Sequence, residues 1–342
     1  MTKARKRLID PEQTPYYHCI SRCVRRSYLC GTDHSTNTNF DHRKQWILDR
    51  IKLLSTVFSI DICAYAIMSN HYHLVLHINQ AYADTFSNTE VIRRWCQVYK
   101  NKLGLRYLAG EKLISAEETL LHSLVDKWRS RLTDISWFMR ALNHNIARRA
   151  NKEDECTGHF WEGRFKSQAL LDEGAVLSCM AYVDLNPVRA NLSETPETSE
   201  FVSIQERIQE HRAEQQGHVP ADNDLMPFQK PIETKERGTH ATAEIRERSC
   251  LPFTRADYLE LVDWTGKNIQ YKGKSSIPGD LAPILTRLHL EPHYWLDHIT
   301  GFHKHFKDMI GQVHLIEATT KALGKQWSKG VSSAEKFYRM IA

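Results

Sequence analysis

The stretch SNHYHLVLHI, residues 69–78, places two histidines two positions apart inside a short apolar run. Alternate residues of a β-strand point to the same face. One face of a strand here carries His71, His73, Val75 and His77. The other face carries the apolar set Tyr72, Leu74, Leu76 and Ile78, which is typical of a core. The pattern therefore predicts a histidine face that is free for something other than packing.

The segments around this run predict a sheet with helices. YYHCISRC (16–23) is rich in β-branched and aromatic residues, and residues 59–78 form two strands joined by a tight Met-Ser-Asn turn. An amphipathic helix lies between them, with Asp41 as its N-cap, and a second helix covers 134–150. Residues 163–171 make a fourth strand. This order predicts an α+β fold with a ferredoxin-like, RRM-like antiparallel sheet.

The rest of the chain divides by composition. Residues 80–130 interrupt the sheet pattern as a largely helical insertion, within a first domain that spans 1–205. Residues 206–250 are poor in apolar side chains and predict a polar linker. Helical patterns return over 251–342, which predicts a small helical accessory domain. Trp295, Phe302, Phe306 and Trp327 are expected to form a core of its own.

Charge and targeting signals limit the class of partner. The net charge is +5, and the segment from Met1 to Arg26 holds seven Lys and Arg against two acids. A basic arm suits a polyanion such as nucleic acid, although a solvated tail is the alternative. Neither a membrane-spanning run nor a signal peptide stands out. Eight cysteines lack paired CxxC spacing, so reduced thiols in a cytoplasmic protein are expected.

A third set of polar residues lies downstream of the fourth strand. DEGAVLSCMAYVDLNP (172–187) predicts a helix that begins at an Asp N-cap and ends near Asn186, because Pro187 disfavours helical geometry before it. Ser178, Tyr182 and Asn186 share one stripe at four-residue spacing. Two imidazoles and the Asn186 amide oxygen leave room on a divalent ion for water and a phosphate oxygen.

These motifs resemble those of a known family. SNHYHLVLHI is similar to the paired-histidine motif of HUH nucleases. GHFWEGRFKS followed by MAYVDLNPVRANL resembles the signature of single-tyrosine transposases of bacterial insertion sequences, most narrowly the branch associated with repetitive extragenic palindromes (REP). The resemblance covers roughly residues 14–205.

The resemblance implies an HUH nuclease fold and a role for each matching position. His71 and His73 match the metal-binding pair, Asn186 the third polar ligand, and Tyr182 the nucleophile. Such an enzyme would use Mg²⁺ or Mn²⁺ to cleave and rejoin single-stranded DNA at hairpins through a 5′-phosphotyrosine. Arg164, Lys166 and Arg189 suit phosphate contacts, and Trp161 suits base stacking, with core packing as the alternative for the aromatic ring.

Two other functions stay open at this stage. The fold could act as a DNA-hairpin-binding regulator without catalysis. A hydrolase of small phosphoesters is disfavoured, because no water-activating base is evident beside the histidines. The accessory region could grip DNA or a partner, or it could be a helical cap on the first domain. Monomer and homodimer are both compatible with the sequence.

Overall fold

The computed structural model describes residues 8–24, 29–33, 37–218, 224–230, 249–270 and 282–338. The first residues of the basic arm, with Arg25 and Arg26, lie outside this range. Within it, no helix is both long enough and apolar enough to cross a membrane.

A five-stranded sheet in the order β4-β5-β1-β6-β7 forms the centre of the molecule. The strands are β1 (Tyr16–Arg22), β4 (Ile60–Ile67), β5 (His71–Ile78), β6 (Lys166–Leu170) and β7 (Met309–Ile310). β1 pairs antiparallel with both β5 and β6, and β4 pairs antiparallel with β5, whereas β6 and β7 are parallel. The expected mixed fold with a mostly antiparallel sheet is confirmed. A separate small ribbon is formed by β2 (Thr32–Asp33) and β3 (Thr38–Asn39).

Two helices cover the Tyr72 face of the sheet. They are α1 (His42–Val57), which starts after Asp41 as expected, and α6 (Ile135–Glu153). Apolar side chains of α6 such as Phe138 and Leu142 are fully buried, and the Tyr72 hydroxyl donates to Asn143 Oδ1 at 2.6 Å. The chain order β1-α1-β4-β5-α6-β6 is a split β-α-β-β-α-β unit, as the alternation of apolar residues predicted.

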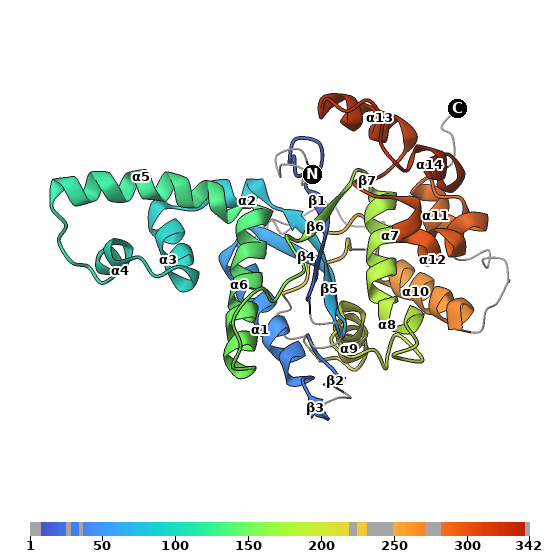
Figure 1. The fold of residues 1–342 in the computed structure, drawn as a ribbon. Coiled ribbons are helices and arrows are strands. Elements are labelled where there is room, and N and C mark those ends of the chain that lie inside the picture. The colour runs from blue at the N-terminus through green and yellow to red at the C-terminus, as the bar shows by residue number, and fades with distance from the viewer. Residues whose placement is uncertain are drawn as a thin grey trace.

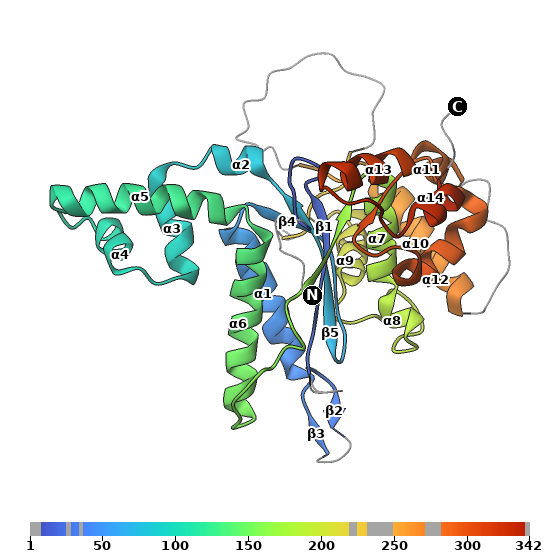
Figure 2. The same cartoon turned by 45° about the horizontal axis from the view of Figure 1, so that its top comes forward.

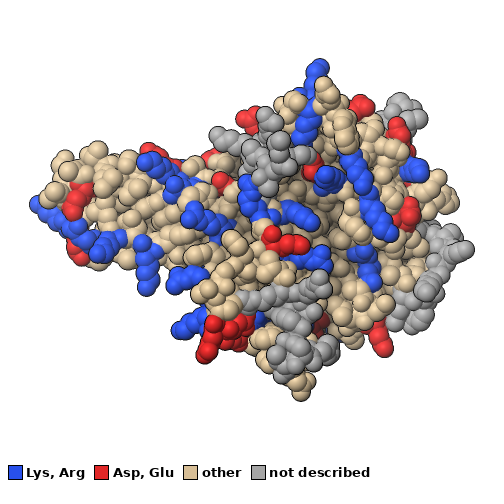
Figure 3. All heavy atoms as spheres, viewed as in Figure 1, with Lys and Arg blue, Asp and Glu red and all other residues tan. Residues whose placement is uncertain are grey.

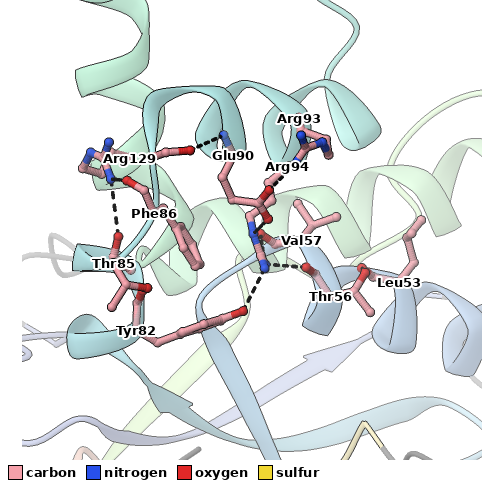
Figure 4. Close-up of polar contacts among 12 residues, drawn as sticks. Leu53, Thr56, Val57, Tyr82, Thr85, Phe86, Glu90, Arg93, Arg94 and Arg129 are labelled. Carbon is pink, nitrogen blue, oxygen red and sulfur yellow. Dashed lines mark hydrogen bonds and ion pairs between the residues drawn. The ribbon is translucent and has the colours of Figure 1, made fainter. Parts of the chain in front are cut away.

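The segment in which a helical insertion was expected forms an arm of four helices beside the sheet (Figures 1 and 2). It comprises α2 (Gln80–Asp84), α3 (Asn88–Val98), α4 (Lys102–Leu108) and α5 (Ser115–Leu132). Buried Arg94 fastens the arm to the end of α1, since its guanidinium donates to the Thr56 carbonyl at 2.5 Å, to Glu90 Oε1 at 2.6 Å and to the Tyr82 hydroxyl at 3.0 Å (Figure 4). Arg129 likewise donates to the Phe86 carbonyl at 2.6 Å.

The opposite face of the sheet is covered by α7 and the C-terminal helices (Figure 1). α7 (Glu173–Asp184) begins at the predicted N-cap, where Asp172 Oδ1 accepts from the Ala175 amide at 2.7 Å. The helices that follow are α8 (Asn186–Arg189), α9 (Ser203–Gln215), α10 (Arg255–Gln270), α11 (Ala282–Arg287), a 3₁₀ turn (Pro292–Tyr294), α12 (Trp295–His305), α13 (Val313–Ala322) and α14 (Val331–Phe337).

The C-terminal region is joined to the first domain more closely than the sequence indicated. Asp172 accepts from the Gln312 amide at 2.7 Å, and buried Asp184 accepts from the Tyr258 hydroxyl. Burial raises the pKa of Asp184 to about 6. Strand β7, which the sequence did not predict, extends the sheet beyond β6.

Two details of the domain prediction need correction. The predicted linker at 206 is still helical, because α9 continues to Gln215, and the Met226 amide donates to the Ile62 carbonyl at 2.8 Å. Residues 231–248 of that linker lie outside the described range. Trp327 was expected in the C-terminal core, but it is 76% exposed. That side chain follows a turn rather than a helix face, so an apolar periodicity does not govern it.

Candidate functional site

The histidine face of β5 is built from three strands in register. Ile20 is paired with His73, Arg22 with His71, and Gln168 with His18. Because side chains alternate along each strand, His18, Ile20 and Arg22 share a face with the paired histidines. That face is not free as expected: His73 is 3% exposed. The reason is that α7 lies across it, with α12 packed on α7.

A cavity of about 570 Å³ opens where this face is left uncovered. Its lining comprises Ile20, Arg22, His71, His73, Glu162, Gly163, Arg164, Lys166, Tyr182 and His303. The structure therefore brings the two predicted metal-binding histidines, the predicted tyrosine and two predicted phosphate-binding cations into one place. Asn186, Arg189 and Trp161 are not among the lining residues.

Tyr182 lies in the last turns of α7 with its ring held on several sides. The ring stacks on Phe302 of α12 at 4.6 Å between centroids, and the Arg189 guanidinium lies 4.3 Å from its centroid. The ring of His73 is 5.7 Å away, at a steep angle. Within the described residues the Tyr182 hydroxyl has no protein hydrogen-bond partner. The ring is therefore fixed by its neighbours at the wall of the cavity, and its hydroxyl is not engaged by another described residue.

A chain of hydrogen bonds determines which nitrogen of His73 is available. Gln168 Oε1 lies 3.2 Å from His18 Nδ1, and His18 Nε2 lies 2.8 Å from His73 Nδ1. An amide oxygen only accepts, so His18 carries its proton on Nδ1 and accepts at Nε2. His73 then donates from Nδ1, which leaves the lone pair on Nε2. That Nε2 atom is buried and has no partner in the described structure.

His71 is arranged in a similar way beside His73. Its Nδ1 lies 2.5 Å from Asn70 Oδ1, and the two histidine rings are 4.9 Å apart. Burial lowers the pKa of His71 and of His18 to about 4, and the pKa of His73 well below its usual value. All three imidazoles are therefore neutral near pH 7. A neutral imidazole is the form that binds a metal ion.

The donors available for a divalent ion are two imidazoles with few other protein groups. In the described part of the chain, no cluster of three or more His, Cys, Asp or Glu has an arrangement suited to a metal. Asn186, four residues after Tyr182, is 8% exposed, and its Nδ2 has no partner there. A histidine that binds a metal through one ring nitrogen usually has its other ring nitrogen hydrogen-bonded. His73 has this arrangement, because Nδ1 is bonded to His18 and Nε2 has no partner in the described residues. Such a donor set fits an ion that keeps positions for water and substrate oxygens.

The remaining predicted DNA contacts lie outside the cavity. Arg189 covers the Tyr182 ring and donates to the Thr300 carbonyl at 3.3 Å. Trp161 packs edge-on against Tyr72, and its indole nitrogen donates to the Asn143 carbonyl at 2.8 Å. Trp161 thus contacts the α6 side of the sheet. Direct DNA contact by either side chain stays a prediction.

Several residues of the site were not predicted from the sequence. They are His18, Ile20, Arg22, Glu162, Gly163, Gln168 and His303. The alternation in YYHCISR gives the face of His18, but only the strand register places it against His73. Glu162 belongs to a motif that was singled out for other residues. His303 reaches the cavity from α12, more than a hundred residues after Tyr182, and no local pattern marks it.

Comparison with known proteins adds one likeness. No family model matches the sequence, and no curated protein matches it. The fold is similar to a solved structure described as "Structure of the REP associates tyrosine transposase bound to a REP hairpin". The identity is 13%, the TM-score is 0.36, and the match covers 70% of this chain and 100% of the other. The cavity and its contacts therefore carry the functional argument.

Proposed function

We propose that this chain is a metal-dependent single-stranded DNA endonuclease and strand transferase that acts at DNA hairpins, with Tyr182 as nucleophile. One observation carries the proposal: Tyr182, whose hydroxyl has no hydrogen-bond partner among the described residues, lines the same cavity as two neutral imidazoles and three cations. The sheet order and the motif resemblance to HUH transposases agree with it.

The chemistry assigned to Tyr182 is an in-line displacement at phosphorus. Its oxygen forms a bond to the scissile phosphorus, the bond to the 3′ oxygen of the preceding nucleotide breaks, and that oxygen leaves as a 3′-hydroxyl. The tyrosine hydroxyl loses one proton and the leaving 3′ oxygen gains one, so no net proton is consumed or released. The product is a 5′-phosphotyrosine that conserves the energy of the broken ester. Rejoining by a 3′-hydroxyl therefore needs no nucleotide cofactor.

The surrounding residues have positioning and charge-stabilising roles. Phe302 and Arg189 hold the Tyr182 ring, which limits the freedom lost on reaching the attack geometry. Arg22, Arg164 and Lys166 line the cavity and suit phosphate oxygens. Nε2 of His73 and of His71 would hold Mg²⁺ or Mn²⁺, which when bound neutralises and orients the scissile phosphate. Asn186 does not line the cavity, so its part as a third ligand stays a prediction.

Glu162 favours a second candidate function. A hydrolase of small phosphoesters needs a base near the histidines. No such base is evident in the sequence, but Glu162 lines the same cavity. A carboxylate there suits activation of a water molecule. A hydrolase releases both products, whereas a tyrosine nucleophile leaves DNA attached to the protein.

Labelled DNA separates these functions. The full chain is incubated with a single-stranded hairpin carrying a label 3′ of the cleavage point, with Mg²⁺ or Mn²⁺, and is then denatured. The proposal predicts a labelled protein band together with a free 3′-hydroxyl fragment. Cleavage without a labelled band indicates that water is the nucleophile, as the Glu162 alternative requires. Hairpin binding without cleavage at any metal concentration indicates a regulator, which contradicts the enzymatic assignment. A cytoplasmic location stays a prediction.

A further inference from the structure

A second cation-lined hollow lies outside the candidate site, on the solvent side of the α1–α6 layer. This hollow, here called the basic groove, has a volume of about 620 Å³. It is lined by Arg50, Val98, Tyr99, Lys100, Arg140, Ala141, His144, Asn145, Arg148, Arg149 and Lys152. No acidic residue is among them. α6 packs on the Tyr72 face of β5, so the groove and the histidine cavity belong to opposite layers of the molecule.

The cations of the groove are not neutralised by acidic groups of the described residues. In the described part of the chain, none of its six Lys and Arg side chains forms an ion pair. The inserted arm is different: Arg93 pairs with Glu90, and Arg106 pairs with Glu111 and Glu117 at 2.7 and 2.6 Å. Figure 3 shows Lys and Arg outnumbering Asp and Glu across one face of the molecule. The groove therefore concentrates unpaired positive charge, whereas arginines of the arm are paired with acidic residues.

The spacing of these residues along α6 forms a continuous stripe. Arg140, His144, Arg148 and Lys152 follow one another at four-residue intervals, so they lie on one side of the helix. Twelve residues of helix rise about 18 Å, which equals roughly five base-pair steps of duplex DNA. Arg148 and Lys152 are like charges at this spacing and repel each other weakly. An anion bound along the stripe would relieve that repulsion.

The aromatic residues around the groove favour a double strand over a single strand. The guanidinium of Arg149 lies 4.1 Å from the centroid of Trp46, and that of Arg140 lies 5.0 Å from Trp137. Tyr99 stacks on Trp95. Single-strand binders need open ring faces for their bases, and these rings are already covered.

The hydroxyl of Tyr99 is an independent sign that the groove takes a ligand. This hydroxyl is buried and has no hydrogen-bond partner in the described residues. Burial raises the pKa of Tyr99, while Arg140 and Arg50 lower it, so both cations act on this phenol. A buried tyrosine hydroxyl normally finds a partner. A phosphate oxygen held by these arginines would accept a hydrogen bond from the Tyr99 hydroxyl.

From these observations we infer that the basic groove binds the phosphate backbone of double-stranded DNA, separately from the single strand in the histidine cavity. The choice of DNA as the polyanion rests on the proposed function. The charge of the groove, the spacing of its cations and the covered aromatic rings are observations that do not depend on that function. Contacts of this type are independent of base sequence and release counterions from the duplex.

The test compares two variants with the same change in charge. Arg140→Gln/Arg148→Gln removes two unpaired cations of the groove, and Arg93→Gln/Arg106→Gln removes two ion-paired cations of the arm. Anisotropy titrations of a labelled duplex without hairpin or single strand are made over a range of salt. We expect the groove variant to bind roughly tenfold more weakly near 0.1 M salt, with a salt slope smaller by about two. The arm variant is expected to change affinity by less than about twofold.

The outcomes are distinguishable from failure of the proposed function. Equal weakening by both variants, or none by either, overturns the inference. A larger loss for single-stranded DNA than for duplex also overturns it. If no protein–DNA adduct ever forms but the groove variant loses duplex binding, the proposed enzyme fails and the inference stands. Should the double variant not fold, the exposed Arg148→Gln change alone is expected to reduce the slope by about one.

Discussion

The two faces of the central sheet differ in how completely their polar groups are satisfied. On the Tyr72 face, α1 and α6 pack apolar side chains against the strands, and the Tyr72 hydroxyl has Asn143 as its partner. On the His73 face, α7 and α12 cover buried His18, Gln168 and His73. Of these three, His73 keeps a buried nitrogen without a partner.

This difference shows which face has a function beyond packing. An unsatisfied buried polar atom costs about 1–3 kcal/mol, and native folds contain few of them. On the opposite, Tyr72 face, the Tyr72 hydroxyl has a hydrogen-bond partner. A buried nitrogen without a partner, beside a cavity lined by Tyr182 and three cations, is typical of a site that a ligand completes.

Removing the cover of the His73 face is expected to have the largest effect. A chain ending at Ser203 loses β7, α10 and α12, including the Phe302 ring against Tyr182 and the Tyr258 bond to Asp184. We expect it to aggregate or to lack native near-ultraviolet circular dichroism, whereas a chain ending at Tyr338 stays folded. A folded, cleaving 1–203 fragment would restore the accessory-module prediction and contradict this packing account.

Removing the two metal-binding imidazoles is the next largest change. His71→Ala/His73→Ala is expected to reduce cleavage by roughly 10³-fold or more, since charge stabilisation worth several kcal/mol is lost. It should also abolish stabilisation by Mn²⁺, which for the wild type is about 2.7 kcal/mol at a hundred times Kd. His77→Ala is the control, because His77 shares the strand face but pairs with Asp61 at 2.9 Å. Wild-type protein whose melting temperature ignores Mn²⁺ would count against the metal site.

A smaller effect is expected from the residue that orients His18. Gln168→Leu removes the acceptor of His18 Nδ1, so the tautomers of His18 and His73 are no longer fixed. Loss of such an outer partner typically costs 10–100-fold in metal affinity or activity, measured here by titration with Mn²⁺ and by cleavage rate. Gln168→Glu keeps an acceptor and should restore much of the affinity. Equal behaviour of the two variants would exclude the hydrogen-bond chain from the site.

His298 tests whether orphaned nitrogens alone identify a site. Both ring nitrogens of His298 lack partners in the described structure, yet it packs among Trp295, Phe302 and Phe337, away from the cavity lining. His298→Phe is expected to raise the free energy of unfolding by about 1–3 kcal/mol near pH 7. An exposed change, His293→Phe, serves as control in urea titrations. A destabilised variant would show that His298 has a role we have not assigned.

The same variant has a defined pH dependence. Burial lowers the pKa of His298 to about 3. Below about pH 6.5 the unfolded chain binds a proton that the folded chain excludes, so this residue reduces stability as the pH falls from about 6.5 toward 3. His298→Phe removes that loss, and its advantage over the wild type should therefore grow as the medium becomes more acidic. An advantage that shrinks on acidification would contradict the lowered pKa.

The sequence predicted what is local and missed what is contributed from a distance. Strand alternation located β5 and its turn at Met68–Asn70, and the Asp172 N-cap located α7. The same alternation could not show that α7 and α12 cover the histidine face. Phe302 and His303 reach the site through tertiary packing, and Gln168 through strand register. Neither is encoded in a short periodic pattern.

The central claim is that Tyr182 forms a covalent bond to DNA, and one comparison tests it most directly. Wild-type protein, Tyr182→Phe and Tyr72→Phe are each incubated with Mn²⁺ and a labelled single-stranded hairpin, and the adducts are digested and mapped by mass spectrometry. Tyr72 is the matched control, since it lies on the other face of the same sheet. We expect adducts at Tyr182 in the wild type and in Tyr72→Phe, and none in Tyr182→Phe, which should still bind the hairpin. An adduct on another residue, or undiminished cleavage by Tyr182→Phe, would contradict the account.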